Sequence, residues 1–298
     1  MSYIIDSYFG LGDNIYQIPF VHKLAQSGEV FIYTPFPELF QFPNVYCYKP
    51  TTNLKLQLEN MTNNGLYSRK SQHRPNGERL RFNYHQGFRN GLSIMRSFES
   101  IIPLEGDFYF KFTSTPSLKA DEIKKRAEKR KKRLCVMRLP SIRKEWSCYP
   151  RIPFMEYFQI CIDYLRQNYY IVTVGDIGNR EEYAGIEPSN IDEKRDRRLV
   201  NHLGIWEVFD LLSKADLVVS PVCNILPICQ ILKKKSFFIY GGYVPHALLN
   251  DERFYQVGHV EPEPFCFCAP KGQYEHKCNK DIPQETLLNK LSETSRGD

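Results

Sequence analysis

The alternation of strand-like and helix-like segments at the start of the chain is the feature that most limits how it can fold. A short apolar run at 3–5 predicts a strand, and the text YFGLGD at 8–13 predicts a glycine turn after it. Residues 14–26 carry apolar side chains at helical spacing, and residues 30–33 predict a second strand. Strand, helix and strand within about 30 residues form a βαβ unit, so we expect two parallel strands in one sheet.

The second half of the chain shows the same alternation. The predicted strands are 134–138, 169–174, 217–220 and 236–240, and the predicted helices are 155–167, 206–213 and 225–232. This order is typical of an α/β fold with a doubly wound parallel sheet. With 298 residues the chain has room for two such domains. We therefore expect two Rossmann-like, doubly wound parallel-sheet domains that face a cleft.

A run of basic residues marks the expected domain boundary. Eight of the ten residues at 124–133 are Lys or Arg. One interpretation is a solvated helix end or linker between an N-terminal domain, 1–123, and a C-terminal domain, 134–298. The other is a patch that contacts the phosphates of a polyanionic acceptor. Within the first domain, the polar stretch 50–100 predicts connections and helices, and 108–112 predicts its last strand.

The charge and the absence of long apolar stretches exclude several protein classes. The net charge of +6 comes from 40 basic and 34 acidic residues, which suits an anionic small ligand as well as nucleic acid. No apolar stretch reaches the length of about 18 residues that a transmembrane helix needs. The first residues lack the basic region and apolar core of a signal peptide. We expect a cytoplasmic protein, in a bacterial cell or a phage-infected host.

The nine cysteines predict reduced thiols, because their number is odd and no signal peptide places the chain in an oxidising compartment. Five of them lie in apolar or strand-like text and are expected to be small core residues: Cys47, Cys135, Cys161, Cys223 and Cys229. The one cluster consists of Cys266, Cys268, His276 and Cys278. It offers three or four zinc ligands at a spacing unlike a standard zinc knuckle, and we expect no metal or other cofactor.

The glycine turn before the first helix contains the candidate catalytic residue. Gly10 and Gly12 let the backbone and the helix N-terminus approach a bound acceptor closely. The turn is not a GxGxxG fingerprint, because Tyr16 stands where that spacing needs its last glycine. Asp13 then has two interpretations: an N-cap of the helix, or a general base that removes a proton from an acceptor hydroxyl.

Two loops of the second half are candidates for binding a diphosphate. Ser141, Arg143, Lys144 and Arg151 follow the predicted strand 134–138 and would place cations beside a hydroxyl, although loop charges often face solvent. The turn after 217–220 would offer the backbone amides of Val222, Cys223 and Asn224, or it is a plain connection. Gly175 ends the predicted strand 169–174 and belongs to the same candidate donor site.

In their order along the chain, these segments resemble the heptosyltransferase-like group of GT-B glycosyltransferases. The similar segments are GLGDNIYQIPFVHKL, RLPSIRKEW with the later Arg151, ADLVVSPVCNILPICQIL and IYGGYVP. The resemblance implies a GT-B fold whose N-terminal domain binds the acceptor and whose C-terminal domain binds the nucleotide-sugar. It implies inverting, metal-independent transfer with Asp13 as the catalytic aspartate. It also implies phosphate binding by Ser141 and by Arg143, Lys144 or Arg151.

The chain departs from this family at the donor turn. The family has an Asp, a small residue and a Gly there, followed by a His, whereas this chain has Val222, Cys223 and Asn224, with Pro227 at the histidine position. The sugar and its nucleotide are therefore left open.

We expect a glycosyltransferase, and two acceptors compete. One is a hydroxyl of a surface glycan or lipid-linked saccharide, as in lipopolysaccharide, and the other is a hydroxymethylated pyrimidine in DNA, as in phage-type DNA modification. A non-catalytic protein that binds nucleotide-sugars or nucleic acid on the same scaffold is the alternative from another class.

Overall fold

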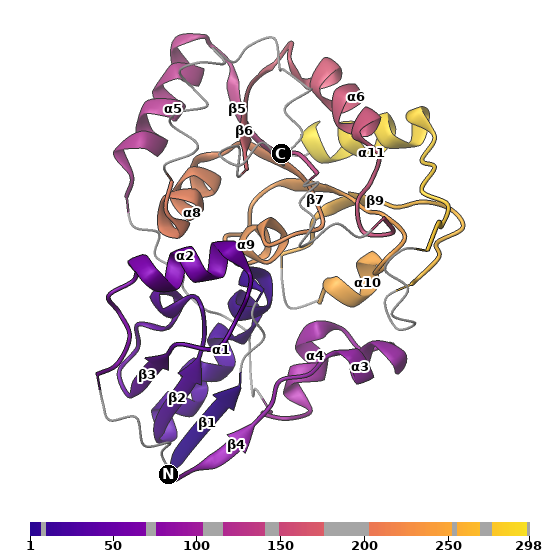
Figure 1. The fold of residues 1–298 in the computed structure, drawn as a ribbon. Coiled ribbons are helices and arrows are strands. Elements are labelled where there is room, and N and C mark those ends of the chain that lie inside the picture. The colour runs from indigo at the N-terminus through magenta and orange to yellow at the C-terminus, as the bar shows by residue number, and fades with distance from the viewer. Residues whose placement is uncertain are drawn as a thin grey trace. The chain divides into compact units, whose positions relative to one another are not determined.

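The chain forms two compact units, each built on its own parallel sheet (Figure 1). The first unit is Met1–Phe110 and the second is Lys111–Asp298. The computed structural model describes residues 1–6, 10–69, 76–103, 116–140, 149–175, 203–251, 255–268 and 276–296. The predicted strand 108–112 lies outside these residues. The expected fold class, α/β with two parallel sheets, is confirmed.

The first unit has four parallel strands in the order β3-β2-β1-β4. The strands are β1 (Ser2–Asp6), β2 (Glu29–Tyr33), β3 (Val45–Tyr48) and β4 (Glu78–Leu80). The helices are α1 (Leu11–Ser27), the 3-10 helix η1 (Pro37–Phe40), α2 (Lys55–Asn63), α3 (His85–Arg89) and α4 (Ile94–Glu99). The predicted βαβ unit is confirmed as β1-α1-β2, in which Ser2 pairs with Glu29 and Asp6 with Tyr33.

Aromatic packing holds the polar stretch of the first unit against α1. The ring of Phe20 on α1 lies 5.5 Å from Phe82 and 5.7 Å from Phe98 on α4, and the latter two rings are 4.9 Å apart. All three rings are buried. The stretch 50–100, predicted as connections and helices, contains helices as expected and also the short strand β4, which pairs with β1.

The second unit has five parallel strands in the order β6-β5-β7-β8-β9. The strands are β5 (Arg133–Arg138), β6 (Tyr169–Val174), β7 (Leu217–Pro221), β8 (Ser236–Ile239) and β9 (Gly258–Val260). The helices are α5 (Leu118–Lys129), α6 (Met155–Leu165), α8 (Ile205–Lys214), α9 (Ile225–Ile231), α10 (His246–Leu249) and α11 (Gln284–Arg296).

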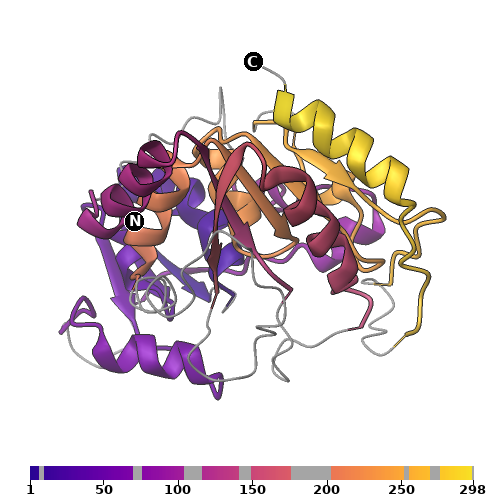
Figure 2. The ribbon, with the colours of Figure 1, turned by 90° about the horizontal axis from the view of Figure 1, so that it is seen from above.

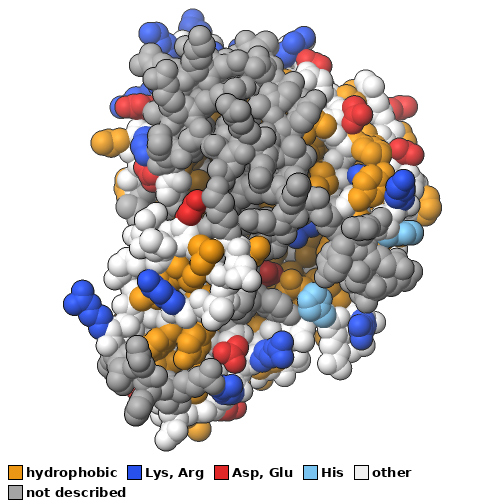
Figure 3. All heavy atoms as spheres, viewed as in Figure 1, with side chains coloured by type: hydrophobic (Ala, Val, Ile, Leu, Met, Phe, Trp, Pro, Cys, Tyr) orange, Lys and Arg blue, Asp and Glu red, His pale blue; other side chains and the backbone are white. Residues whose placement is uncertain are grey.

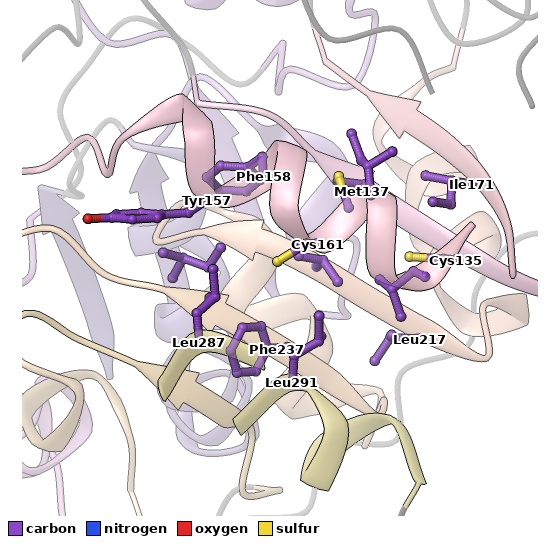
Figure 4. Close-up of a cluster of buried hydrophobic side chains, with 14 of the residues drawn as sticks. Cys135, Met137, Tyr157, Phe158, Cys161, Ile171, Leu217, Phe237, Leu287 and Leu291 are labelled. Carbon is purple, nitrogen blue, oxygen red and sulfur yellow. The ribbon is translucent and has the colours of Figure 1, made fainter. Parts of the chain in front are cut away.

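Helices cover both faces of the second sheet. The inward side chains Cys135 and Met137 of β5 pack in a buried cluster with α6 and α11, which lie side by side in Figures 1 and 2. Figure 4 shows this cluster, in which Phe158 from α6 and Leu287 from α11 approach the strands. Successive strand side chains point to opposite faces, so Leu134 and Val136, which are also fully buried, point toward the other layer, where α5 and α8 pack on each other and on β5.

The basic run 124–133 belongs to the second unit, so the expected linker and boundary are corrected. Its first six residues are the last turns of α5, and Arg133 begins β5. The apolar side chains Ile123 and Ala127 of α5 are buried, which ties this helix to the sheet rather than leaving it between domains. The two units meet in sequence at residues 110 and 111, ahead of the run. Among the described helices, none is long and apolar enough to cross a bilayer.

One carboxylate joins α5 to the central strands. Asp216 Oδ2 accepts a hydrogen bond from Lys124 Nζ and another from the Leu134 N–H, both at 2.7 Å. Burial alone would raise the pKa of Asp216, but these two hydrogen bonds, together with the charges of Lys124 and Lys234, outweigh it and hold the pKa below its ordinary value. The ionised form of Asp216 is therefore the form that stabilises the fold.

We expect Asp216→Ala to lower the free energy of unfolding at pH 7 by about 1–2 kcal/mol, a modest loss because the side chain is partly exposed. A carboxylate with a depressed pKa stabilises above its unfolded-state pKa and loses this effect as the pH falls through its folded-state pKa. The difference from wild type should therefore shrink below about pH 4. Urea denaturation at several pH values measures it.

The matched control is Asp163→Ala on α6. It removes an exposed carboxylate that pairs with Arg166, three residues later at the end of the same helix. Such a pair contributes about 0.5 kcal/mol or less. Equal losses for the two variants would show that the Asp216 hydrogen bonds do not hold α5 in place.

Candidate functional site

The turn at the start of α1 holds Asp13 close to the glycine that caps the helix. Gly10 is the N-cap and α1 begins at Leu11, so Asp13 is the third helical residue and not the N-cap, which corrects the first of its two interpretations. A Cβ on residue 10 would lie 2.5 Å from Asp13 Oδ2, so a larger residue there would displace the carboxylate from this position. Unpaired N–H groups and the helix dipole favour a negative charge in a first turn. Asp13 is partly exposed.

A buried polar network lies beneath this turn and joins it to the end of β2. Asn14 is fully buried, and its Nδ2 donates to Gly10 O at 2.8 Å. Thr34, which follows β2, donates from Oγ1 to Asn14 Oδ1 at 2.6 Å. Gln17 Nε2 donates to Asp13 O at 3.1 Å, while its buried Oε1 has no partner among the described residues. The network fixes the backbone on which Asp13 stands.

The hydroxyl of Tyr16 is a neutral neighbour of Asp13. Burial, and secondarily the negative charge of Asp13, raises the pKa of Tyr16 far above its ordinary value. Sequence reasoning missed Asn14, Gln17 and Thr34. Two polar residues on the buried face of an amphipathic helix were the signal that could have identified this network.

The strand register of the second unit brings three of its candidate segments to one edge. β5 pairs with β6 as far as Arg138–Val174, and with β7 as far as Met137–Val219. Gly175 and the 222–224 turn therefore leave the sheet at the same carboxyl edge from which the chain enters the 141–151 loop. The chain runs from β5 to β6 on one side and returns to β7 on the other, so this edge is a topological switch point, where ligands bind in open α/β sheets.

The turn after β7 has already used the donors at the start of α9. The Ile225 N–H contacts Cys223 Sγ at 3.5 Å, and the Leu226 N–H donates to Cys223 O at 3.1 Å. Pro227 has no N–H. A phosphate at this turn would have to use the amides of residues 222–224, all of which are partly exposed. Cys223, expected in the core, lies partly exposed at this edge, whereas Cys47, Cys135, Cys161 and Cys229 are buried as predicted.

Arg151 reaches the same edge beside the exit of β8. A Cβ on Gly241 would lie 2.3 Å from Pro150 O and 2.9 Å from Arg151 C, so the 149–152 loop packs directly on a glycine backbone. Arg151 itself is partly exposed. The other predicted residues of this loop, Ser141, Arg143 and Lys144, lie outside the described residues.

Lys280 holds the loop that carries Arg151, and sequence reasoning missed it. Lys280 is 4% exposed, and its Nζ donates to Tyr149 O at 3.2 Å and to Ile152 O at 2.9 Å. The same ammonium lies 3.6 Å from the centroid of the Tyr149 ring. Tyr157 on α6 fixes the segment around Lys280, because its hydroxyl donates to Lys280 O and accepts from the Ile282 N–H. No local pattern marks a lysine in a polar tail for such burial.

Two further groups lie near β8 and β9, and His259 of the first group is the middle residue of β9. His246 and His259 stack with ring centroids 3.6 Å apart, and Tyr240 Oη lies 3.0 Å from His246 Nδ1. Burial, with a smaller effect of His259, lowers the pKa of His246 to about 3, so its imidazole is neutral at pH 7. Within the described part of the chain, the thiols of Cys266, Cys268 and Cys278 lie close enough together to hold a metal ion, and the exposed His276 is not part of that group.

We expect Lys280→Met to lower the free energy of unfolding by about 2–4 kcal/mol, because two carbonyls lose a charged donor and an aromatic ring loses its cation. Hydrogen exchange of residues 149–154 should accelerate in the same variant. Lys277→Met, three residues earlier and exposed, should change neither quantity. Identical urea midpoints for the two variants would contradict the role given to Lys280.

The comparisons with known proteins concern the fold. No protein-family model matches the chain, and no curated protein matches it in sequence. Among solved structures, the chain is similar to the ADP-heptose lps heptosyltransferase II of E. coli, at 12% identity and a TM-score of 0.59 over 99% of this chain and 98% of that one.

Two other structures give the same result. One is the iron-containing dodecameric glycosyltransferase TibC of enterotoxigenic E. coli, with 12% identity and a TM-score of 0.62 over 99% of this chain and 76% of that one. The other is the glycosyl transferase family 9 protein of Veillonella parvula, with 10% identity and a TM-score of 0.56 over 99% and 97%. The chain thus has the two-sheet fold of heptosyltransferase-like glycosyltransferases, as the sequence resemblance implied.

Proposed function

We propose that this protein is a glycosyltransferase that transfers a sugar from a nucleotide-sugar to an acceptor hydroxyl. The observation that carries the proposal is the carboxylate of Asp13, which is partly exposed in the first turn of α1, close to Gly10 at the N-cap. In the proposal, the first unit supplies this base and the acceptor site at Gly10 and Gly12, and the second unit binds the nucleotide-sugar.

The donor site in this proposal is the carboxyl edge of the second sheet. The switch point between β5 and β7 supports it, together with the partly exposed Gly175 and 222–224 turn. Arg151, with Arg143, Lys144 and the hydroxyl of Ser141, would neutralise the diphosphate as it leaves. Three cations in one loop supply this charge without a metal ion, so we propose metal-independent transfer.

The proposed chemistry is a single in-line displacement at the anomeric carbon. Asp13 takes the proton of the acceptor hydroxyl while its oxygen forms the new bond to the anomeric carbon. The bond from that carbon to the diphosphate oxygen breaks with its electron pair, and the sugar inverts. The neutral Tyr16 hydroxyl below the turn adds no charge that would oppose ionisation of Asp13.

We expect Asp13→Asn to reduce kcat by about 10²–10⁴-fold, because a positioned general base contributes this much to the rate. The amide is close in size to the carboxylate, so the fold and the donor KM should change little. The matched control is Glu78→Gln, which alters an exposed carboxylate on β4 at the amino edge of the same sheet. A folded Asp13→Asn variant with near-normal transfer would show that another group is the base.

The position of the basic run favours a saccharide acceptor over DNA. Residues 129–133 lie at the amino end of β5, and this six-residue strand separates them by about 17 Å from the carboxyl edge where the donor is proposed to bind. Several cations of the basic run 124–133 also make contacts within the protein. Lys124 pairs with Asp216. Arg130 lies over the ring of Tyr170, and Arg133 lies over the ring of Tyr169. On the face drawn in Figure 3, Lys and Arg side chains are dispersed among other types.

A donor panel tests the activity and the acceptor together. Purified protein is given UDP-, GDP-, ADP- and CMP-linked sugars, and release of nucleotide is followed without acceptor, with a lipopolysaccharide core saccharide and with hydroxymethylcytosine DNA. We expect slow release from one donor, accelerated by the saccharide. If DNA accelerates the release of nucleotide and the saccharide does not, the acceptor is DNA and the saccharide proposal is wrong.

The altered donor turn motivates a second candidate, a binding protein without catalysis. Residues 222–224 differ from the family pattern, and the amides at the start of α9 are already used. A rise in Tm with one nucleotide-sugar, but no release of nucleotide with any acceptor, would establish this candidate. Neither release nor a Tm shift with any nucleotide would reject both.

A further inference from the structure

Three cysteine thiols that the proposed reaction does not use converge in the second unit. Sγ atoms of Cys266, Cys268 and Cys278 all lie within 4.8 Å of one another. Cys268 and Cys278 are buried and Cys266 is partly exposed. The sulfur atoms of Cys266 and Cys268 are 3.2 Å apart, well beyond the length of a disulfide, which is about 2.05 Å, and all three cysteines are free. The thiols thus form an unbonded cluster.

The cluster is packed against a backbone that leaves no space for a side chain. A Cβ on Gly242 would lie 2.5 Å from Cys278 Sγ and 3.3 Å from Cys266 Cβ. The Cys268 N–H donates to Gly242 O at 3.2 Å. Three separate stretches of chain therefore meet here: the exit of β8, the segment 266–268 and the segment 276–278.

We propose that Cys266, Cys268 and Cys278 bind one thiophilic metal ion, zinc or iron, as a structural site. Thiolates select these metals, and three thiolates fill three positions of a tetrahedral ion. Two sulfurs bound to one ion at about 2.3 Å lie about 3.8 Å apart, so the observed cluster needs shifts of only about 1 Å to close on it. Binding exchanges the thiol protons for the divalent ion and involves no redox step.

The surroundings of the cluster argue for a structural role. Gly241, next to the cluster, packs on the backbone of the 149–152 loop, and Lys280, two residues after Cys278, donates to two carbonyls of that loop. An ion at the cluster would fasten the C-terminal segment to the β8 exit and, through both contacts, would stiffen the loop that carries Arg151. The proposal does not depend on glycosyl transfer, because metal content is measured without substrate.

The test is the metal content of the full-length protein, expressed in medium supplemented with zinc and iron and purified under reducing, oxygen-free conditions. We expect elemental analysis to find on the order of one zinc or iron ion per chain. Cys266→Ser is the main variant because this residue is partly exposed and its replacement disturbs packing least. The metal content per chain of this variant should fall at least about tenfold, whereas that of Cys47→Ser, in the first unit, should stay unchanged.

Three further measurements keep the test independent of folding defects. Cobalt added to metal-depleted wild-type protein should give the intense visible bands of a tetrahedral thiolate site, and Cys266→Ser should not. Removing the ion with a chelator should lower the Tm by about 5 °C or more. Gly242→Ala, which forces a methyl group against Cys278 Sγ, should lower metal content, and Gly65→Ala, which has open space, should not.

Three results would overturn the proposal. The first is wild-type protein with less than about a tenth of an ion per chain after metal supplementation. The second is a Cys266→Ser variant that retains its full metal content, which would place the ion elsewhere. The third is mass-spectrometric evidence of a disulfide among the three cysteines in protein purified without oxygen.

Discussion

The pairing of β5 with both β6 and β7 is the constraint on which the second unit depends. Because β5 lies between two parallel neighbours, every connection that leaves this part of the sheet begins at the same edge. The chain reverses its direction of winding between β5 and β7, and such a switch point is where ligands bind in open α/β sheets. Strand register alone places Gly175, the 222–224 turn and residues 139–140, which follow β5, at this edge.

The C-terminal segment then determines the geometry of that edge. Burying a lysine is costly unless its ammonium is hydrogen-bonded, and Lys280 meets this requirement with the carbonyls of Tyr149 and Ile152. The same contacts give a charged donor to two carbonyls of the loop. The thiol cluster beside Gly242 would reinforce these contacts.

The sequence was sufficient to predict those strands and helices in which the local residue pattern agrees with the tertiary structure. The buried run YYIVTV predicted a strand at 169–174, which is the range of β6, and the amphipathic segment 206–213 lies within α8. β4 was not predicted, because its three residues are mostly exposed and only pairing with β1 makes them a strand. α1 was predicted to begin at residue 14, since glycines disfavour helices, yet Gly10 is its N-cap and Gly12 lies in its first turn.

The residues of the candidate site divide in the same way, into those that a local sequence pattern predicts and those that only tertiary contacts explain. Asp13 and the 222–224 turn could be selected from the sequence, because a strand followed by a small-residue turn and a helix is a local pattern. Lys280 could not, because its partners lie 128 and 131 residues away and no periodicity signals its burial. The thiol spacing was visible in the sequence, but its meaning required the close approach of Gly242, which only the fold provides.

Hydrogen exchange with and without nucleoside diphosphates tests the central claim that a nucleotide-sugar binds at the carboxyl edge of the second sheet. Wild-type protein is measured with ADP, UDP, GDP and CDP in turn. We predict that one nucleotide protects residues 139–153 and 222–226 and leaves the amino edge, at 129–133, unchanged. Protection centred on 129–133, or no protection by any nucleotide at saturating concentration, would contradict the claim.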